Sequence, residues 1–143
     1  MNDPITVEQF SQADPATVYR HLVESDRWIL WQGVSATLDP QPGGLFRMET
    51  SDGRTARGQF VEVVPDRRVV FSWGWTDMPS LPPGSTTVEI DLVPIDNGTL
   101  IKLRHTGLAP DEAVMHEMGW CRYLTRLDIA STGGDPGPDV GPA

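Results

Sequence analysis

The segment from Ala109 to Ala130 constrains the fold of this chain most, because it is the only long stretch with an unbroken helical pattern. Pro110 suits the first turn of a helix, and Asp111 places negative charge at the positive end of the helix dipole. Residues three and four apart form two neighbouring apolar stripes: His116, Trp120, Tyr123 and Leu127, and Val114, Met118, Cys121 and Leu124. Together they form an apolar arc too wide for an ordinary surface helix, so we expect this helix to lie in the concave side of a sheet.

The sequence before this helix is rich in short strand patterns separated by turns. Asp14 and Pro15 mark the start of a helix that ends near Glu24, and residues 26–33 (DRWILWQG) predict a second short helix. Runs of alternating apolar and polar residues predict strands at 5–10, 34–38, 45–50, 56–64, 68–75, 86–93 and 99–106. This order predicts an α+β fold with a half-exposed antiparallel sheet.

The length and composition indicate one domain, which we place at residues 1–130. Residues 131–143 (STGGDPGPDVGPA) are mostly glycine, proline and polar residues, so we expect a mobile tail there. The 11 Lys and Arg residues against 20 Asp and Glu give a net charge of −9, which disfavours nucleic acid and membrane surfaces as partners. We expect a cytoplasmic protein, because no leader-like or membrane-spanning run is present, and no intrachain disulfide, because Cys121 is the only cysteine.

Several stretches of the sequence resemble a known superfamily. They are WILW, PGGLFRM, GQFVEVVPDRRVVFSWGW, PPGSTTVEIDLVP, GTLIKLRHTGL and HEMGWCRYLTRL, and the resemblance covers roughly residues 5–130. The chain resembles the START-like or SRPBCC superfamily, in particular the bacterial branch similar to the C-terminal domain of the activator of the 90-kDa heat-shock-protein ATPase. This resemblance implies a helix-grip fold: a curved antiparallel sheet of about six to seven strands around a long C-terminal helix, with two short helices after the first strand and a mostly apolar cavity. It also implies a ligand or partner-protein function and a link to stress response.

Aromatic and methionine side chains are the candidate lining of that cavity. Phe71, Trp73 and Trp75 alternate along one strand and share a face, and the proline-rich loop 76–85 that follows is a candidate lid. Trp and Met side chains line apolar ligand sites, but they also serve as ordinary core packing. The candidate ligand-binding residues are Trp28, Trp31, Phe46, Met48, Phe71, Trp73, Trp75, His105, Met115, Met118, Trp120 and Tyr123.

Two histidines are the candidate catalytic residues. His116 lies on the helix near Gly119, and His105 shares a strand face with Ile101 and Leu103, so both could point toward the interior. Two converging imidazoles could exchange a proton with a ligand near neutral pH. Alternatively, each makes a hydrogen bond that fixes how the helix docks. We expect Cys121 to be a buried, inert thiol, and no residue spacing indicates a metal site or a nucleotide or other cofactor.

Three functions follow from these patterns. The first is a binding module for a small hydrophobic molecule in the cavity between the sheet and helix 109–130. The second is an enzyme of the cyclase, aromatase or hydrolase type that uses His116 or His105 as a proton shuttle. The third is a protein-interaction or chaperone-regulating module, either with a partner protein or as a homodimer. An enclosed, predominantly apolar void of roughly a few hundred Å³ favours the first, convergent polar groups with shifted pKa values favour the second, and an exposed apolar patch over a filled core favours the third.

Overall fold

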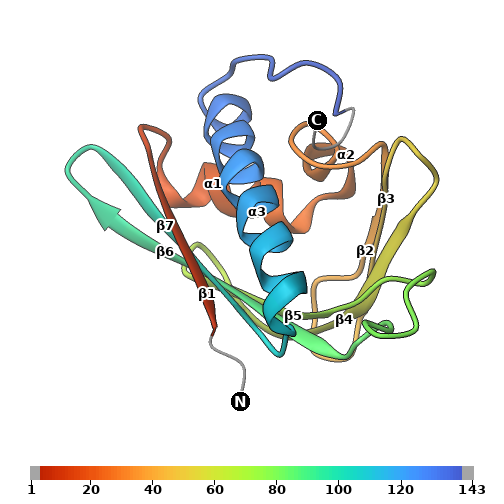
Figure 1. Ribbon diagram of the computed structural model, residues 1–143. Coiled ribbons are helices and arrows are strands. Elements are labelled where there is room, and N and C mark those ends of the chain that lie inside the picture. The colour runs from red at the N-terminus through yellow and green to blue at the C-terminus, as the bar shows by residue number, and fades with distance from the viewer. Residues whose placement is uncertain (1–3, 140–143) are drawn as a thin grey trace.

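The computed structural model describes residues 4–139 and has the predicted α+β helix-grip architecture. A curved, seven-stranded antiparallel sheet wraps around one long helix, α3, while two short helices connect the first strand to the second (Figure 1). The strand order across the sheet is β1-β7-β6-β5-β4-β3-β2. The elements are β1 (Ile5–Ser11), α1 (Pro15–Val23), α2 (Ser25–Trp28), β2 (Ser35–Leu38), β3 (Leu45–Glu49), β4 (Thr55–Val64), β5 (Arg68–Trp73), β6 (Thr86–Ile95), β7 (Gly98–Thr106) and α3 (Pro110–Ser131).

Local sequence signals determine where the helices begin. The Asp14 side chain caps α1 by accepting a hydrogen bond from the backbone N–H of Thr17, at 2.8 Å. At α3, the Glu112 carboxylate accepts a hydrogen bond from the backbone N–H of Ala109, the residue that precedes the helix. Helix α2 is shorter than predicted, because its last turns open into a loop that ends at Gly33 with a positive φ of 75°.

The sheet bends where its register changes. Strands β4 and β5 lose regular pairing between Phe60 and Glu62, which leaves Val61 as an extra residue. Strand β5 ends at Trp73, two residues before the predicted end, and Trp75 then makes one isolated bridge to Ala56. The bend turns the β3 and β4 end of the sheet up beside the helix, as Figure 1 shows.

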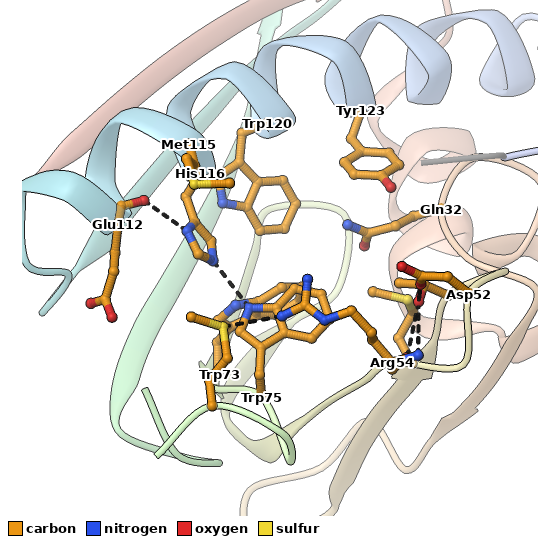
Figure 2. Close-up of a pocket in the computed structure, with 14 residues that line it drawn as sticks. Gln32, Asp52, Arg54, Trp73, Trp75, Glu112, Met115, His116, Trp120 and Tyr123 are labelled. Atoms are coloured by element: carbon orange, nitrogen blue, oxygen red, sulfur yellow. Dashed lines mark hydrogen bonds between the residues drawn. The ribbon is translucent and has the colours of Figure 1, made fainter. Parts of the chain in front are cut away.

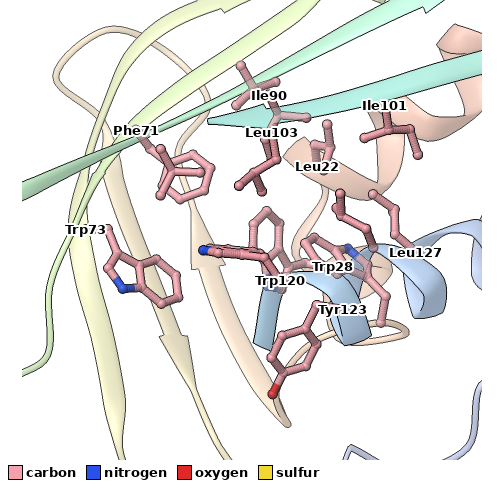
Figure 3. Close-up of a cluster of buried hydrophobic side chains, with 14 of the residues drawn as sticks. Leu22, Trp28, Phe71, Trp73, Ile90, Ile101, Leu103, Trp120, Tyr123 and Leu127 are labelled. Carbon is pink, nitrogen blue, oxygen red and sulfur yellow. The ribbon is translucent and has the colours of Figure 1, made fainter. Parts of the chain in front are cut away.

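A core of aromatic and aliphatic side chains lies between the sheet and the helices (Figure 3). The rings of Phe46 and Phe71 stack with their centroids 4.2 Å apart, and the ring of Trp28 meets both rings edge-on. Trp31 packs against Trp28 with a centroid distance of 4.5 Å. All four are fully buried. Each therefore stabilises the fold through the favourable free energy of removing a large aromatic ring from water.

Helix α3 buries one face only, which corrects the predicted wide apolar arc. Of the first predicted stripe, Trp120, Tyr123 and Leu127 are buried, and His116 is partly buried. The prediction that the second stripe is buried is wrong for Val114, Met118 and Cys121, which are exposed. The reason is that α3 packs against β1 and α1, and these lie on one side of it, so the first three turns of the helix have no neighbour on the opposite side.

The segment after α3 is tied down, in contrast to the mobile tail that its composition predicts. The buried Arg126 guanidinium donates to the carbonyl oxygens of Pro136 and Gly137, at 2.9 and 2.8 Å. The Asp139 carboxylate accepts a hydrogen bond from the backbone N–H of Gly33 at 2.7 Å. Residues 140–143 of the predicted tail lie outside the described residues. The contacts explain the difference, because they offset the ordering entropy of a segment that lacks large apolar side chains.

Candidate functional site

A cavity of about 170 Å³ lies between α3 and the sheet, bounded by the β3–β4 hairpin and the loop 76–85 (Figure 2). It is partly open to solvent. Trp73 and Trp120 form part of its wall and lie with their ring centroids 5.3 Å apart. The predicted lining residues that do border it are Met48, Trp73, Trp75, Met115, Trp120 and Tyr123, together with the catalytic candidate His116.

The remaining predicted lining residues lie elsewhere. Trp28, Trp31, Phe46 and Phe71 are core residues beneath the cavity, and His105 is buried behind the wall. Met118 is 70% exposed and does not border the cavity. These differences share one cause: strand and helix periodicity predict which residues face inward, but side-chain size and the distance between layers decide which of them reach the open space.

Several cavity residues were not predicted from the sequence. Gln32 follows α2, and Thr50, Asp52 and Arg54 belong to the β3–β4 hairpin. They are polar residues in or beside turns, and nothing in the local pattern distinguishes them from ordinary surface residues. Met78 from loop 76–85 and Glu112 from α3 complete the unpredicted part of the wall.

His105 is held by hydrogen bonds at both ring nitrogens. The Thr86 hydroxyl donates to the carbonyl oxygen of Trp73 at 2.8 Å, so it accepts the N–H of His105 Nε2 at 2.9 Å. Nδ1 of His105 is then the acceptor for the indole N–H of Trp120, at 3.0 Å. Burial, with a smaller effect of the neighbouring His116, lowers the pKa of His105 to about 3. His105 is therefore a neutral, structural imidazole that orients Trp120.

His116 has the same kind of arrangement at the cavity wall. Its Nδ1–H donates to the carbonyl oxygen of Glu112 at 2.8 Å, and its Nε2 accepts the indole N–H of Trp75 at 3.2 Å (Figure 2). Burial lowers the pKa of His116 below its usual value. The rings of His105 and His116 lie with their centroids 5.5 Å apart. Protonation of either ring would break a hydrogen bond to a tryptophan, so this geometry matches the predicted docking role of the histidines.

Charged and polar contacts connect the rim of the cavity. The Arg54 guanidinium lies over the Trp75 ring at 4.3 Å and forms a 3.0 Å ion pair with Asp77 of the loop 76–85. From the same loop, the Ser80 hydroxyl donates to Glu112 of α3 at 2.9 Å. The loop is therefore fastened to the hairpin on one side and to the helix on the other, as expected of a lid.

Tyr123 lies on the far wall of the cavity and stays protonated. Burial, together with the negative charge of Asp139, raises the pKa of its phenol to about 12. Within residues 4–139, no cluster of three or more His, Cys, Asp or Glu residues could hold a metal ion, and no helix there is long and apolar enough to cross a membrane. The described site thus combines an apolar, aromatic wall with the neutral side chains of His116 and Tyr123 and with three charged side chains, Asp52, Arg54 and Glu112.

The curved sheet that grips one long helix, with a cavity between them, defines a protein of the helix-grip class. Residues 12–131 match the profile of the family described as Activator of Hsp90 ATPase homolog 1-like protein, abbreviated AHSA1, and the chain belongs to this family. No curated protein matches the chain.

Solved structures agree with this assignment. An AHSA1-like protein of Rhizobium etli is 39% identical, with 99% of this chain and 89% of that chain covered and a TM-score of 0.76. The Aha1 dimer of Colwellia psychrerythraea is 19% identical, with 95% and 100% covered and a TM-score of 0.82. CalU16 of Micromonospora echinospora is 24% identical, with 91% and 76% covered and a TM-score of 0.74. The last two likenesses show the fold alone.

Proposed function

We propose that this protein binds a small, mainly apolar molecule in the cavity between the sheet and α3, without catalysing a reaction. The observation that carries the proposal is the space itself, about 170 Å³ that tryptophan, methionine and tyrosine side chains border but do not fill. Native cores are packed to the density of organic crystals, and empty apolar space weakens the fold. Because such space lowers stability when it is empty, we expect a ligand to occupy this cavity.

The volume limits the ligand. An engineered apolar cavity of about 150 Å³ in another protein binds benzene, so the space here fits one aromatic ring or a short branched chain. Because the cavity is partly open, a longer molecule could insert one end and leave the other in solvent. The aromatic walls favour a flat ring, which can stack on or meet an indole edge-on.

The hydrogen bonds of the two histidines favour binding over catalysis. A general base needs a free nitrogen within hydrogen-bond reach of the substrate, whereas His105 and His116 each use both nitrogens within the protein. Their lowered pKa values keep both rings neutral at pH 7. The proton-shuttle alternative therefore has less support from the geometry.

Toluene is a suitable first probe of the cavity. A substitution at Gly119 tests whether toluene binds there. A side chain added at Gly119, which borders the cavity, meets no other atom within 4 Å at its Cβ. We expect Gly119→Leu to weaken toluene binding by about tenfold or more, because the new side chain takes up ligand space, and we expect the thermal stabilisation by toluene to disappear.

The matched control is Val114→Leu. Val114 lies on the same helix, is 62% exposed and does not border the cavity, so this variant should bind toluene like the wild type. Isothermal titration and thermal unfolding at several toluene concentrations measure both quantities. Absence of saturable binding to the wild type, or equal binding by Gly119→Leu, would contradict the proposal.

Self-association is a second candidate function, based on the exposed apolar side chains of α3. Val114, Met115 and Met118 are 62%, 73% and 70% exposed on neighbouring turns, and such a patch commonly marks a protein contact. The Colwellia relative is a dimer, which makes a second copy of this chain the natural occupant. Sedimentation velocity over a range of concentrations distinguishes a monomer from a dimer.

A further inference from the structure

The side chain of Gln32 is the most unusual polar group in the cavity wall. The residue is only 2% exposed, yet its carboxamide oxygen Oε1 has no hydrogen-bond partner among the described residues. Figure 2 shows the carboxamide extending between Tyr123 and Trp75 toward the middle of the cavity. A buried amide group that lacks a partner costs roughly 1–3 kcal/mol, and such groups are rare in native proteins.

The backbone around Gln32 is fixed from two directions. On one side, Arg126 of α3 donates to the carbonyl oxygen of Trp31 at 2.9 Å. On the other side, the N–H of Gly33 donates to Asp139 at 2.7 Å. The position of Gln32 is thus set by contacts that do not involve its own side chain, an arrangement typical of a preorganised binding group.

The polar character of the ligand follows from the rest of the wall. Trp73, which also borders the cavity, has an indole N–H without a partner, so a second polar atom of the wall is unsatisfied. The charged groups that border the cavity are Asp52, Arg54 and Glu112, and Arg54 is already paired with Asp77 outside it. This surplus of negative charge disfavours a carboxylate or phosphate ligand.

We propose that Gln32 is the specificity-determining residue of this cavity and that it hydrogen-bonds a hydroxyl group of a neutral ligand whose remaining part is apolar. The inference rests on the proposed binding function. A carboxamide can present its oxygen as an acceptor or, after rotation about its last bond, its NH₂ group as a donor. A hydroxyl both donates and accepts, so it satisfies Gln32 in either orientation.

The pair p-cresol and toluene tests this inference, because the two molecules differ by one hydroxyl. We expect isothermal titration to show that the wild type binds p-cresol at least tenfold more tightly than toluene. This ratio is corrected for hydration by the ratio of the octanol–water partition coefficients of the two molecules. Gln32→Leu keeps a side chain of similar size. In this variant the preference for p-cresol should fall to the ratio that octanol–water partition alone gives, while the affinity for toluene stays the same or improves. Val114→Leu, a substitution on the exposed side of α3 outside the cavity, should retain the preference.

The outcomes separate the two proposals. If toluene binds the wild type but p-cresol shows no extra preference, or if Gln32→Leu retains the preference, the role of Gln32 is refuted while the cavity proposal stands. If neither molecule binds the wild type, both proposals fail. A readout that needs no variant is the side-chain amide resonance of Gln32 in NMR titrations, which should shift strongly with p-cresol and only weakly with toluene; equal shifts would also refute the role of Gln32.

Discussion

At the scale of single residues, the histidines of this protein act through the tryptophans that they hold. His105 and His116 each accept an indole N–H, from Trp120 and Trp75, and both indoles border the cavity. A tryptophan inside a protein usually needs a partner for its N–H, and a neutral imidazole supplies one without introducing a charge. The two histidines therefore hold both indoles of the cavity wall without adding a charge there.

The neutral state of His105 predicts a loss of stability at acidic pH. Its pKa is about 3 in the folded protein against 6.5 as the ordinary value, so below pH 6.5 the unfolded chain binds a proton that the folded chain does not. The free energy of unfolding should therefore fall as the pH decreases from 6.5, by about 2 kcal/mol at pH 5 from this residue, and His105 should contribute almost no pH dependence above pH 7.5. Urea unfolding at pH 7.5 and pH 5 measures this difference.

The variant His105→Gln isolates the contribution of this residue. It should be less stable than the wild type at pH 7.5, because the Thr86 and Trp120 hydrogen bonds are disturbed, yet it should lose about 2 kcal/mol less between pH 7.5 and pH 5. Equal losses in the two proteins would mean that His105 titrates normally in the folded state.

At the scale of secondary-structure elements, α3 has distinct roles along its length. Its C-terminal half contributes Leu124 and Leu127 to the core, whereas the N-terminal half borders the cavity and leaves Met115 and Met118 exposed. Gly119 lies between the two halves. Glycine in the middle of a helix is unfavourable because of its backbone freedom, so its presence here needs a reason other than helix formation, and open space at the cavity is the one that the structure offers.

The substitution Gly119→Ala tests this view of the helix. Because the added Cβ meets no atom within 4 Å, the free energy of unfolding should rise by about 0.5–1 kcal/mol in urea denaturation. The matched control is Gly58→Ala in β4, where the Cβ would collide with the backbone of Ser72 and should destabilise the protein. A loss of stability in Gly119→Ala would show that Gly119 is required for packing.

At the scale of the whole molecule, the last described residues hold a loop next to the cavity in place. Asp139 is 5% exposed, bonds to the N–H of Gly33, and forms a 3.1 Å ion pair with Arg122 of α3. Through these contacts the C-terminal segment holds the loop that carries Gln32 against the helix. The described C-terminal segment therefore supports the site.

The substitution Asp139→Ala should weaken this support. It leaves the buried N–H of Gly33 and the Arg122 guanidinium without their partner, which should lower the free energy of unfolding by about 2 kcal/mol. Asp128→Ala removes the same charge from α3, where the Asp128 side chain makes no hydrogen bond within the described residues, and should change stability by less than about 0.5 kcal/mol. Similar losses in the two variants in urea denaturation would contradict a supporting role for Asp139.

The sequence by itself determined the element order, the start of both longer helices and the alternation of side chains along the strands. It did so because these features depend on neighbours within a few residues, as with Asp14 at the start of α1 and the alternation of Phe71 and Trp73. Periodicity placed His105 and His116 where they could point inward, and in the structure His105 is buried and His116 is partly buried.

Only the tertiary structure decided which inward-facing residues fill space and which surround it. Phe46 and Phe71 stack on each other, whereas Trp73 and Trp120 border the cavity, although the sequence pattern is the same. The deciding quantity is the separation of the helix from the bent sheet, which depends on contacts between distant residues. The burial of Gln32 has the same origin, because it results from bonds that Arg126 and Asp139 make to its neighbours in the chain.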